Sequence, residues 1–77
     1  MITQRLDKYR INQMAEISTV VQNSLTAKLT DMGLFSGKKI RVLFRAPLGD
    51  PIAVDVEGYI LSLRLDEAAM IQVTPVE

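Results

Sequence analysis

Cysteine and histidine are both absent from the 77 residues of this chain. Without cysteine, neither a disulfide nor a thiolate metal site can stabilise the fold. Without histidine, the chain lacks the commonest general base and the commonest transition-metal ligand. The usual nucleophile–base pairs of covalent catalysis are therefore unavailable. We expect no catalytic residues, no metal site and no cofactor, and hence a protein that is not an enzyme.

An excess of charge of one sign is also missing, because nine basic residues face nine acidic ones. Proteins that bind DNA or RNA usually carry a basic excess, so no nucleic-acid partner is expected. No apolar run approaches the roughly 20 residues that span a bilayer. The first ten residues contain no apolar core of the signal-peptide kind. These absences favour a soluble cytoplasmic protein without membrane insertion.

Apolar residues are not scarce: they make up 48% of the chain, as in an ordinary packed domain. The length allows one small domain, and no linker, internal repeat or low-complexity segment divides it. We therefore expect a single domain over residues 1–77.

Short runs in which apolar and polar residues alternate predict five strands. They cover residues 14–21, 39–45, 52–57, 59–65 and 71–75. In the second strand, Ile40, Val42 and Phe44 are expected to point inward. Glu57 and Gly58 should form a tight hairpin turn between the third and fourth strands.

One short helix is predicted between the first two strands, with Ser24 as its N-cap. Gly33 suits the left-handed residue that ends a helix, and Leu34 should then contact the helix. Single helical turns are expected near Leu6 and over residues 66–70, the latter capped by Asp66. The predicted core comprises Ile17, Leu25, Leu29, Met32, Ile40, Val42, Val54, Val56, Leu61, Leu63, Ile71 and Val73.

This pattern predicts an all-β fold with one short helix. Turn signals recur at the spacing of about 8 to 12 residues that suits a small barrel or a sandwich. We expect a five-stranded barrel, because closing the sheet protects its edge strands.

The segment RAPLGDP, residues 45–51, connects two predicted strands. Two prolines stiffen it, and Leu48 stands at a turn where a polar residue is more usual. One hypothesis is a turn that only reverses the chain, with Leu48 folded over the barrel mouth. The other is a partner-binding loop with Leu48 as anchor, together with an adjoining helix end. The residues predicted for this surface are Met32, Gly33, Leu34, Ala46, Pro47, Leu48, Gly49, Asp50 and Pro51.

Two charged groups allow alternative interpretations. The four cations within residues 38–45 suit either a phosphate site or a solvated strand face. Asp55 and Glu57 should share one strand face, either as paired carboxylates or as solvated side chains.

The stretch from Leu29 to Val73 resembles the ferrous-iron transport protein A (FeoA) family. The resemblance rests on MGL at residues 32–34 with Gly37, APLGDP at 46–51, Gly58, LSLR at 61–64 and EA at 67–68. It implies an SH3-like barrel and a cytosolic, non-enzymatic accessory protein. The implied partner is a membrane ferrous-iron permease that carries a GTP-binding domain.

A second hypothesis is a regulatory or sensor domain. The same small barrel resembles the C-terminal domain of metal-dependent transcriptional repressors. Against it, the chain has no DNA-reading helix and neither imidazole nor thiolate ligands. The sequence does not predict an oligomeric state.

Overall fold

The computed structural model describes residues 2–76. Its strands are β1 (Gln4–Arg5), β2 (Met14–Val20), β3 (Lys39–Arg45), β4 (Ile52–Val56), β5 (Tyr59–Leu63) and β6 (Ile71–Pro75). A short 3-10 helix, η1 (Leu6–Lys8), follows β1, and α1 (Leu65–Ala68) connects β5 to β6. The helical turn expected near Leu6 is thus η1.

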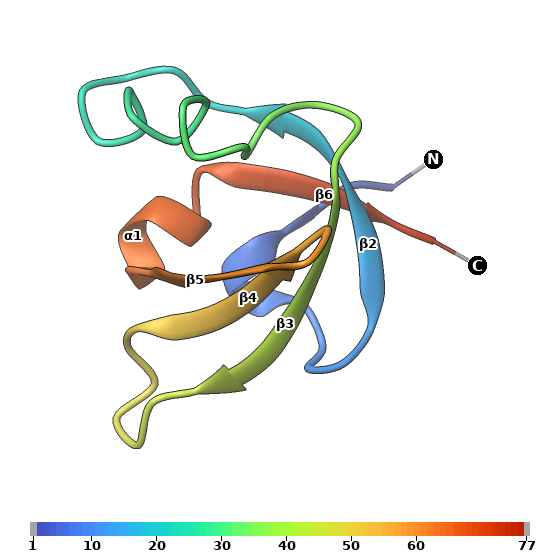
Figure 1. The fold of residues 1–77 in the computed structure, drawn as a ribbon, viewed down its shortest axis with the longest axis vertical. Helices are drawn as coiled ribbons and strands as arrows, with labels where there is room; N and C mark the ends of the chain where they lie inside the picture. Colours follow the sequence, from blue (N-terminus) through green and yellow to red (C-terminus); the bar gives the residue numbers. More distant parts are fainter. Residues whose placement is uncertain (1, 77) are drawn as a thin grey trace.

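The strands form one antiparallel sheet in the order β1-β6-β2-β3-β4-β5. The sheet curves strongly, and α1 lies against its concave side (Figure 1). The predicted fold class, a small all-β domain with one short helix, is confirmed. The five expected strands are present, and β1 is an additional one. Its two residues are exposed and too few to show any alternation. Within residues 2–76, β1 and β5 are the two ends of the strand order, so hydrogen bonds between strands do not close the barrel, contrary to the expectation.

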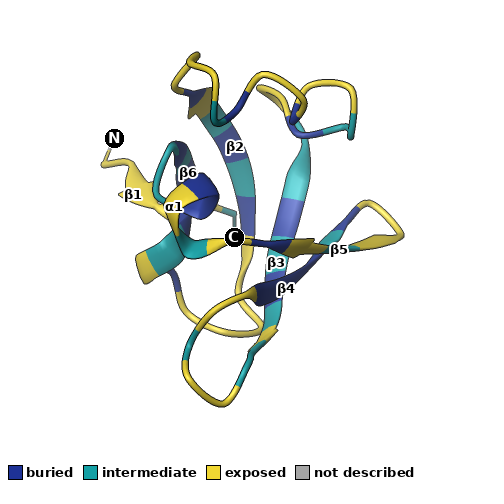
Figure 2. Cartoon of the chain, turned by 90° about the vertical axis from the view of Figure 1, so that its left-hand side faces the viewer, coloured by how far each residue is buried: buried dark blue, intermediate teal, exposed yellow. Residues whose placement is uncertain are grey.

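The core fills the inside of the curved sheet, where the buried segments gather (Figure 2). Most predicted core residues are buried, and Met32 and Leu61 pack half-buried against them. The prediction for Leu25 is wrong, because its side chain is half-buried and lies outside the core. The buried apolar residues outside the predicted core set are Leu6, Tyr9, Ala15, Val20, Leu34, Ile52, Ala53 and Ala68.

The prediction that the Phe44 side chain points inward from β3 is wrong. The side chain is 61% exposed, although alternation placed it inward. Between Val42 and Phe44 the register against β4 shifts by one residue, so Leu43 is the extra residue of a β-bulge. Because side chains alternate with period two, one extra residue turns the following side chains to the other face. A second shift, between Ile17 and Thr19, does the same in β2.

Residues 22–34 form a chain of turns, so the predicted regular helix is wrong. Most of its backbone hydrogen bonds span three residues, as from Leu29 N–H to the Thr26 carbonyl at 2.9 Å. Asn23, not Ser24, caps the segment: its Oδ1 accepts the N–H groups of Leu25 and Thr26 at 2.9 and 3.1 Å.

The expected end of this segment is confirmed. Gly33 has φ +93°, and Leu34 N–H donates to the Leu29 carbonyl at 2.9 Å. Gly33 N–H donates to the Thr30 carbonyl at 3.0 Å. This pair of hydrogen bonds is a Schellman motif, which needs a left-handed residue where the glycine stands.

The helical turn near residue 66 is α1, but its N-cap is Arg64 and not Asp66. The Glu67 carboxylate accepts the Arg64 backbone N–H at 2.9 Å. Glu67 therefore satisfies a donor that the start of the helix would otherwise leave unpaired.

Candidate functional site

The loop of residues 46–51 projects from one end of the sheet, between β3 and β4 (Figure 1). Its base is closed by a hydrogen bond from Ala46 N–H to the Pro51 carbonyl at 3.0 Å. Inside it, Gly49 N–H donates to the Ala46 carbonyl at 2.7 Å, with Gly49 at φ +89°. This turn holds Leu48 outward with 96% of its surface exposed. Leu48 does not fold back over the barrel.

Asp50 fixes the loop to the rest of the domain. Its Oδ1 accepts the backbone N–H of Leu65, the first residue of α1, at 3.1 Å. The Asp50–Pro51 peptide bond is cis. A shallow hollow of about 330 Å³, lined by Asp50, Pro51, Arg64 and Asp66, lies between the loop and α1. The loop therefore presents an apolar tip on a base held by hydrogen bonds.

The other part of the predicted surface, residues 32–34, lies at the opposite end of the domain (Figure 1). Leu34 is fully buried and belongs to the core, so no partner can contact its side chain. Met32 and Gly33 line a hollow of about 440 Å³ with Asp31, Tyr59 and Leu61. The structure therefore does not bring this segment together with the loop.

The cations of residues 38–45 are paired within the fold. Lys38 lies 3.4 Å from Glu57, Lys39 lies 3.1 Å from Glu16, and Arg41 lies 3.6 Å from Asp55. The fourth cation, Arg45, donates to the Tyr9 carbonyl at 3.1 Å. These contacts favour the solvated strand face over a phosphate site.

Asp55 and Glu57 do not form a carboxylate pair. Asp55 Oδ1 accepts the Gly58 N–H at 2.9 Å and so closes the hairpin turn. Glu57, at φ 50° in that turn, reaches across to β3, where its Oε2 accepts the Lys39 N–H at 3.0 Å. That hydrogen bond lowers the pKa of Glu57, with a smaller contribution from Lys38. Each carboxylate thus has a structural partner of its own.

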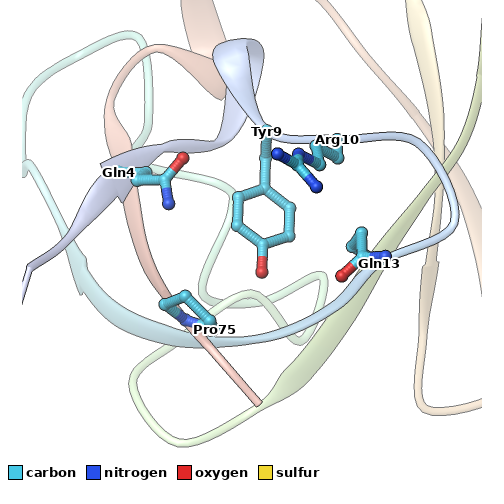
Figure 3. Close-up of a pocket in the computed structure, with 5 residues that line it drawn as sticks. All are labelled: Gln4, Tyr9, Arg10, Gln13 and Pro75. Atoms are coloured by element: carbon cyan, nitrogen blue, oxygen red, sulfur yellow. The ribbon is translucent and has the colours of Figure 1, made fainter. Parts of the chain in front are cut away.

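A hollow of about 250 Å³ that the sequence did not indicate lies between residues 4–13 and Pro75 at the end of β6 (Figure 3). Gln4, Tyr9, Arg10, Gln13 and Pro75 line it. The Tyr9 hydroxyl donates to the Met14 carbonyl at 3.2 Å, so the ring is held in place. In the sequence, this region gave only the expectation of a helical turn near Leu6, three residues before Tyr9.

Among residues 2–76, no three acidic side chains gather where they could hold a metal ion. Within the same residues, no helix is long and apolar enough to cross a bilayer. The clearest candidate for contact with another molecule is thus the exposed 46–51 loop.

Comparison with known families identifies a match over nearly the whole chain. The profile of the FeoA domain family matches residues 4–75. The NMR structure of the FeoA-like protein from Clostridium acetobutylicum is 35% identical in sequence and superimposes with a TM-score of 0.90. The match covers 100% of this chain and 91% of the C. acetobutylicum chain. Comparison with curated protein sequences finds no match.

Two further structures share the fold. The zinc complex of Stenotrophomonas maltophilia FeoA has 23% identity, coverage of 96% and 91% of the two chains, and a TM-score of 0.78. It is described as an SH3 domain protein and a candidate ferrous-iron transport activating factor. A manganese-dependent transcriptional repressor has 18% identity and a TM-score of 0.89, over 99% of this chain but 38% of its own. The barrel is therefore SH3-like.

Proposed function

Because this chain belongs to the FeoA family, we propose that it is a cytoplasmic, non-enzymatic accessory protein of ferrous-iron uptake. Its partner is the cytoplasmic part of a membrane ferrous-iron permease that carries a GTP-binding domain. Family membership supports a role in ferrous-iron transport, and the S. maltophilia relative is described as a candidate activating factor for it.

The observation that carries the binding role is the exposure of Leu48 on a loop held at its base. Leu48 is 96% exposed, so a partner's pocket that covers it removes apolar surface from water and thereby lowers the free energy of the complex. The hydrogen bonds of Ala46, Gly49 and Asp50 already order the loop, so docking loses little conformational entropy. We assign the partner-binding surface to Ala46, Pro47, Leu48, Gly49, Asp50 and Pro51.

Met32 and Gly33 are a separate part of this proposal. They lie at the opposite end of the domain from the loop, so a partner that contacts both parts must extend along the whole length of the domain. We place the main contact at the loop because its apolar tip is the more exposed.

A pull-down with the permease's cytoplasmic domain, with and without guanine nucleotide, tests the proposal. Leu48→Ser should abolish capture and leave the melting temperature unchanged, since the side chain touches almost nothing in the domain. Phe44→Ser is the matched control, because Phe44 is also an exposed apolar residue but lies on β3. Equal capture of wild type and Leu48→Ser would place the interface elsewhere.

A second candidate function is a regulatory or sensor domain, which the fold shared with the manganese-dependent repressor favours. The chain covers 38% of that repressor, so the likeness extends to only part of the repressor. Gene neighbourhood separates the two functions: an adjacent permease gene favours the transport role.

A further inference from the structure

The edge strand β5 offers a second surface for contact, independent of the permease-binding loop. Among the described residues, 2–76, it is last in the sheet and pairs only with β4. Tyr59 and Ile60 on this strand are 73% and 70% exposed. A five-residue strand with exposed apolar side chains can pair with another strand.

The free hydrogen-bonding groups of this edge follow from the β4–β5 register. Val56 is paired with Tyr59 across the two-residue turn, and pairs that flank such a turn exchange both backbone hydrogen bonds. The backbone N–H and C=O groups of successive residues point to opposite sides of a strand. Those of Tyr59 point toward β4, so those of Ile60 and Ser62 point away from it. No loop or turn within residues 2–76 bonds to these groups.

The usual protection of an edge is missing here. Edge strands of soluble monomers commonly carry a charged residue, a proline or a bulge. β5 has the sequence YILSL, and its register with β4 runs without a shift. The opposite edge, β1, is by contrast only two residues long and includes Arg5.

Opposite charges lie near the two ends of β5. Asp31 lines the hollow of about 440 Å³ beside Tyr59 and Leu61, at one end. Arg64 follows the last residue of β5 and lines another hollow with Ser24 and Lys28. Arg64 also lines the hollow of Asp50, Pro51 and Asp66, so it borders both the turns of residues 22–34 and the 46–51 loop. Among residues 2–76, neither Asp31 nor Arg64 forms an ion pair.

We propose that β5 pairs with β5 of a second copy of this chain, antiparallel about a two-fold axis at Leu61. In this register Tyr59 lies opposite Leu63 of the other copy, and Ile60 lies opposite Ser62. The outward N–H and C=O groups of Ile60 then exchange hydrogen bonds with those of Ser62 of the other copy, and the reciprocal pair forms as well. All five residues of the strand are thus paired.

Charge favours a second copy over an unrelated strand. Antiparallel pairing brings the Arg64 end of one copy to the Asp31 end of the other. Because the axis is two-fold, the same contact forms twice, as in other symmetric dimers. The apolar hollow beside Tyr59 and Leu61 is then covered by the strand of the second copy.

Sedimentation equilibrium over about 10 μM to about 1 mM, where weak dimers form, tests the pairing. Ser62→Pro removes an N–H that β4 does not use and blocks a neighbouring strand. We expect its dimer dissociation constant to rise about tenfold or more at an unchanged melting temperature. Ser62→Ala keeps the N–H and should dimerise like wild type. A wild-type protein that is monomeric over the whole range, or a Ser62→Pro variant that dimerises equally well, would overturn the proposal.

A charge exchange tests the register. Asp31→Lys and Arg64→Glu should each weaken the dimer, since each places like charges together at both contacts. The double variant restores opposite charges and should recover most of the affinity. Two single effects that simply add in the double variant would rule out the Asp31–Arg64 contact and, with it, the proposed register.

Discussion

The carboxylate of Asp50 accepts the backbone N–H of Leu65 at 3.1 Å and so joins the exposed loop to α1. These residues are fifteen apart in the sequence. The first turn of a helix leaves its N–H groups unpaired, and an acceptor from outside the helix satisfies one of them here. The loop that carries Leu48 is thus part of the rigid fold.

Asp50→Ala should lower the free energy of unfolding by about 1 kcal/mol, the usual effect of losing a helix-capping acceptor. Asp50→Asn retains an oxygen that can accept the Leu65 N–H and should stay closer to wild type. Urea denaturation measures both. An alanine variant as stable as wild type would show that this hydrogen bond does not stabilise the domain.

Leu29→Ala should destabilise the protein by about 2–5 kcal/mol, because it removes a fully buried side chain from the core. Leu25→Ala is the matched control in the same chain of turns. Leu25 is half-buried and outside the core, so its truncation should cost less than Leu29→Ala. Thermal melts of the two variants give the comparison, and similar shifts would contradict the burial pattern.

Glu57 should make stability depend on pH on the acid side. Its pKa is lowered from the ordinary 4.5, first by the hydrogen bond from Lys39 N–H. A lowered pKa in the folded state adds stability above the unfolded value, and this contribution is lost as the pH falls through the folded value. Wild type should therefore exceed Glu57→Gln in melting temperature at neutral pH, and the difference should shrink below pH 4.5. A difference that is constant with pH would argue against the Glu57 contact.

Tight binding of a transition metal is not expected, because the chain offers neither histidine nor cysteine. Calorimetry with ferrous iron or zinc should show only weak binding to carboxylates. Stoichiometric binding below about 1 μM by the wild-type protein would contradict this prediction.

The strands of the fold could be predicted because alternation survives wherever a strand is regular. In β4, Val54 and Val56 point inward as their spacing requires. The Schellman ending was also predictable, since Gly33 and Leu34 make it with local contacts alone. The turn that carries Leu48 was predictable from its prolines and glycine, but the sequence left open whether the side chain is exposed or folds over the barrel.

The remaining features depend on partners distant in the sequence. The bulge at Leu43 exists only against β4, so the pattern within β3 could not show that Phe44 turns outward. The hydrogen bond from the Leu65 N–H to Asp50 likewise joins two segments whose contact no local sequence pattern indicates. Residues 32–34 and the loop were expected to lie side by side. The strand order decides which connections lie at the same end of a sheet, and it separates these two segments.

The two edges of the sheet differ in length, five residues in β5 against two in β1. A copy bound through β5 leaves only the β1 edges exposed at the outer sides of the pair. Two residues provide too few backbone groups to hold a further strand. Assembly through this sheet would therefore stop at a closed pair, and the same unequal edges would keep the protein from growing into fibres.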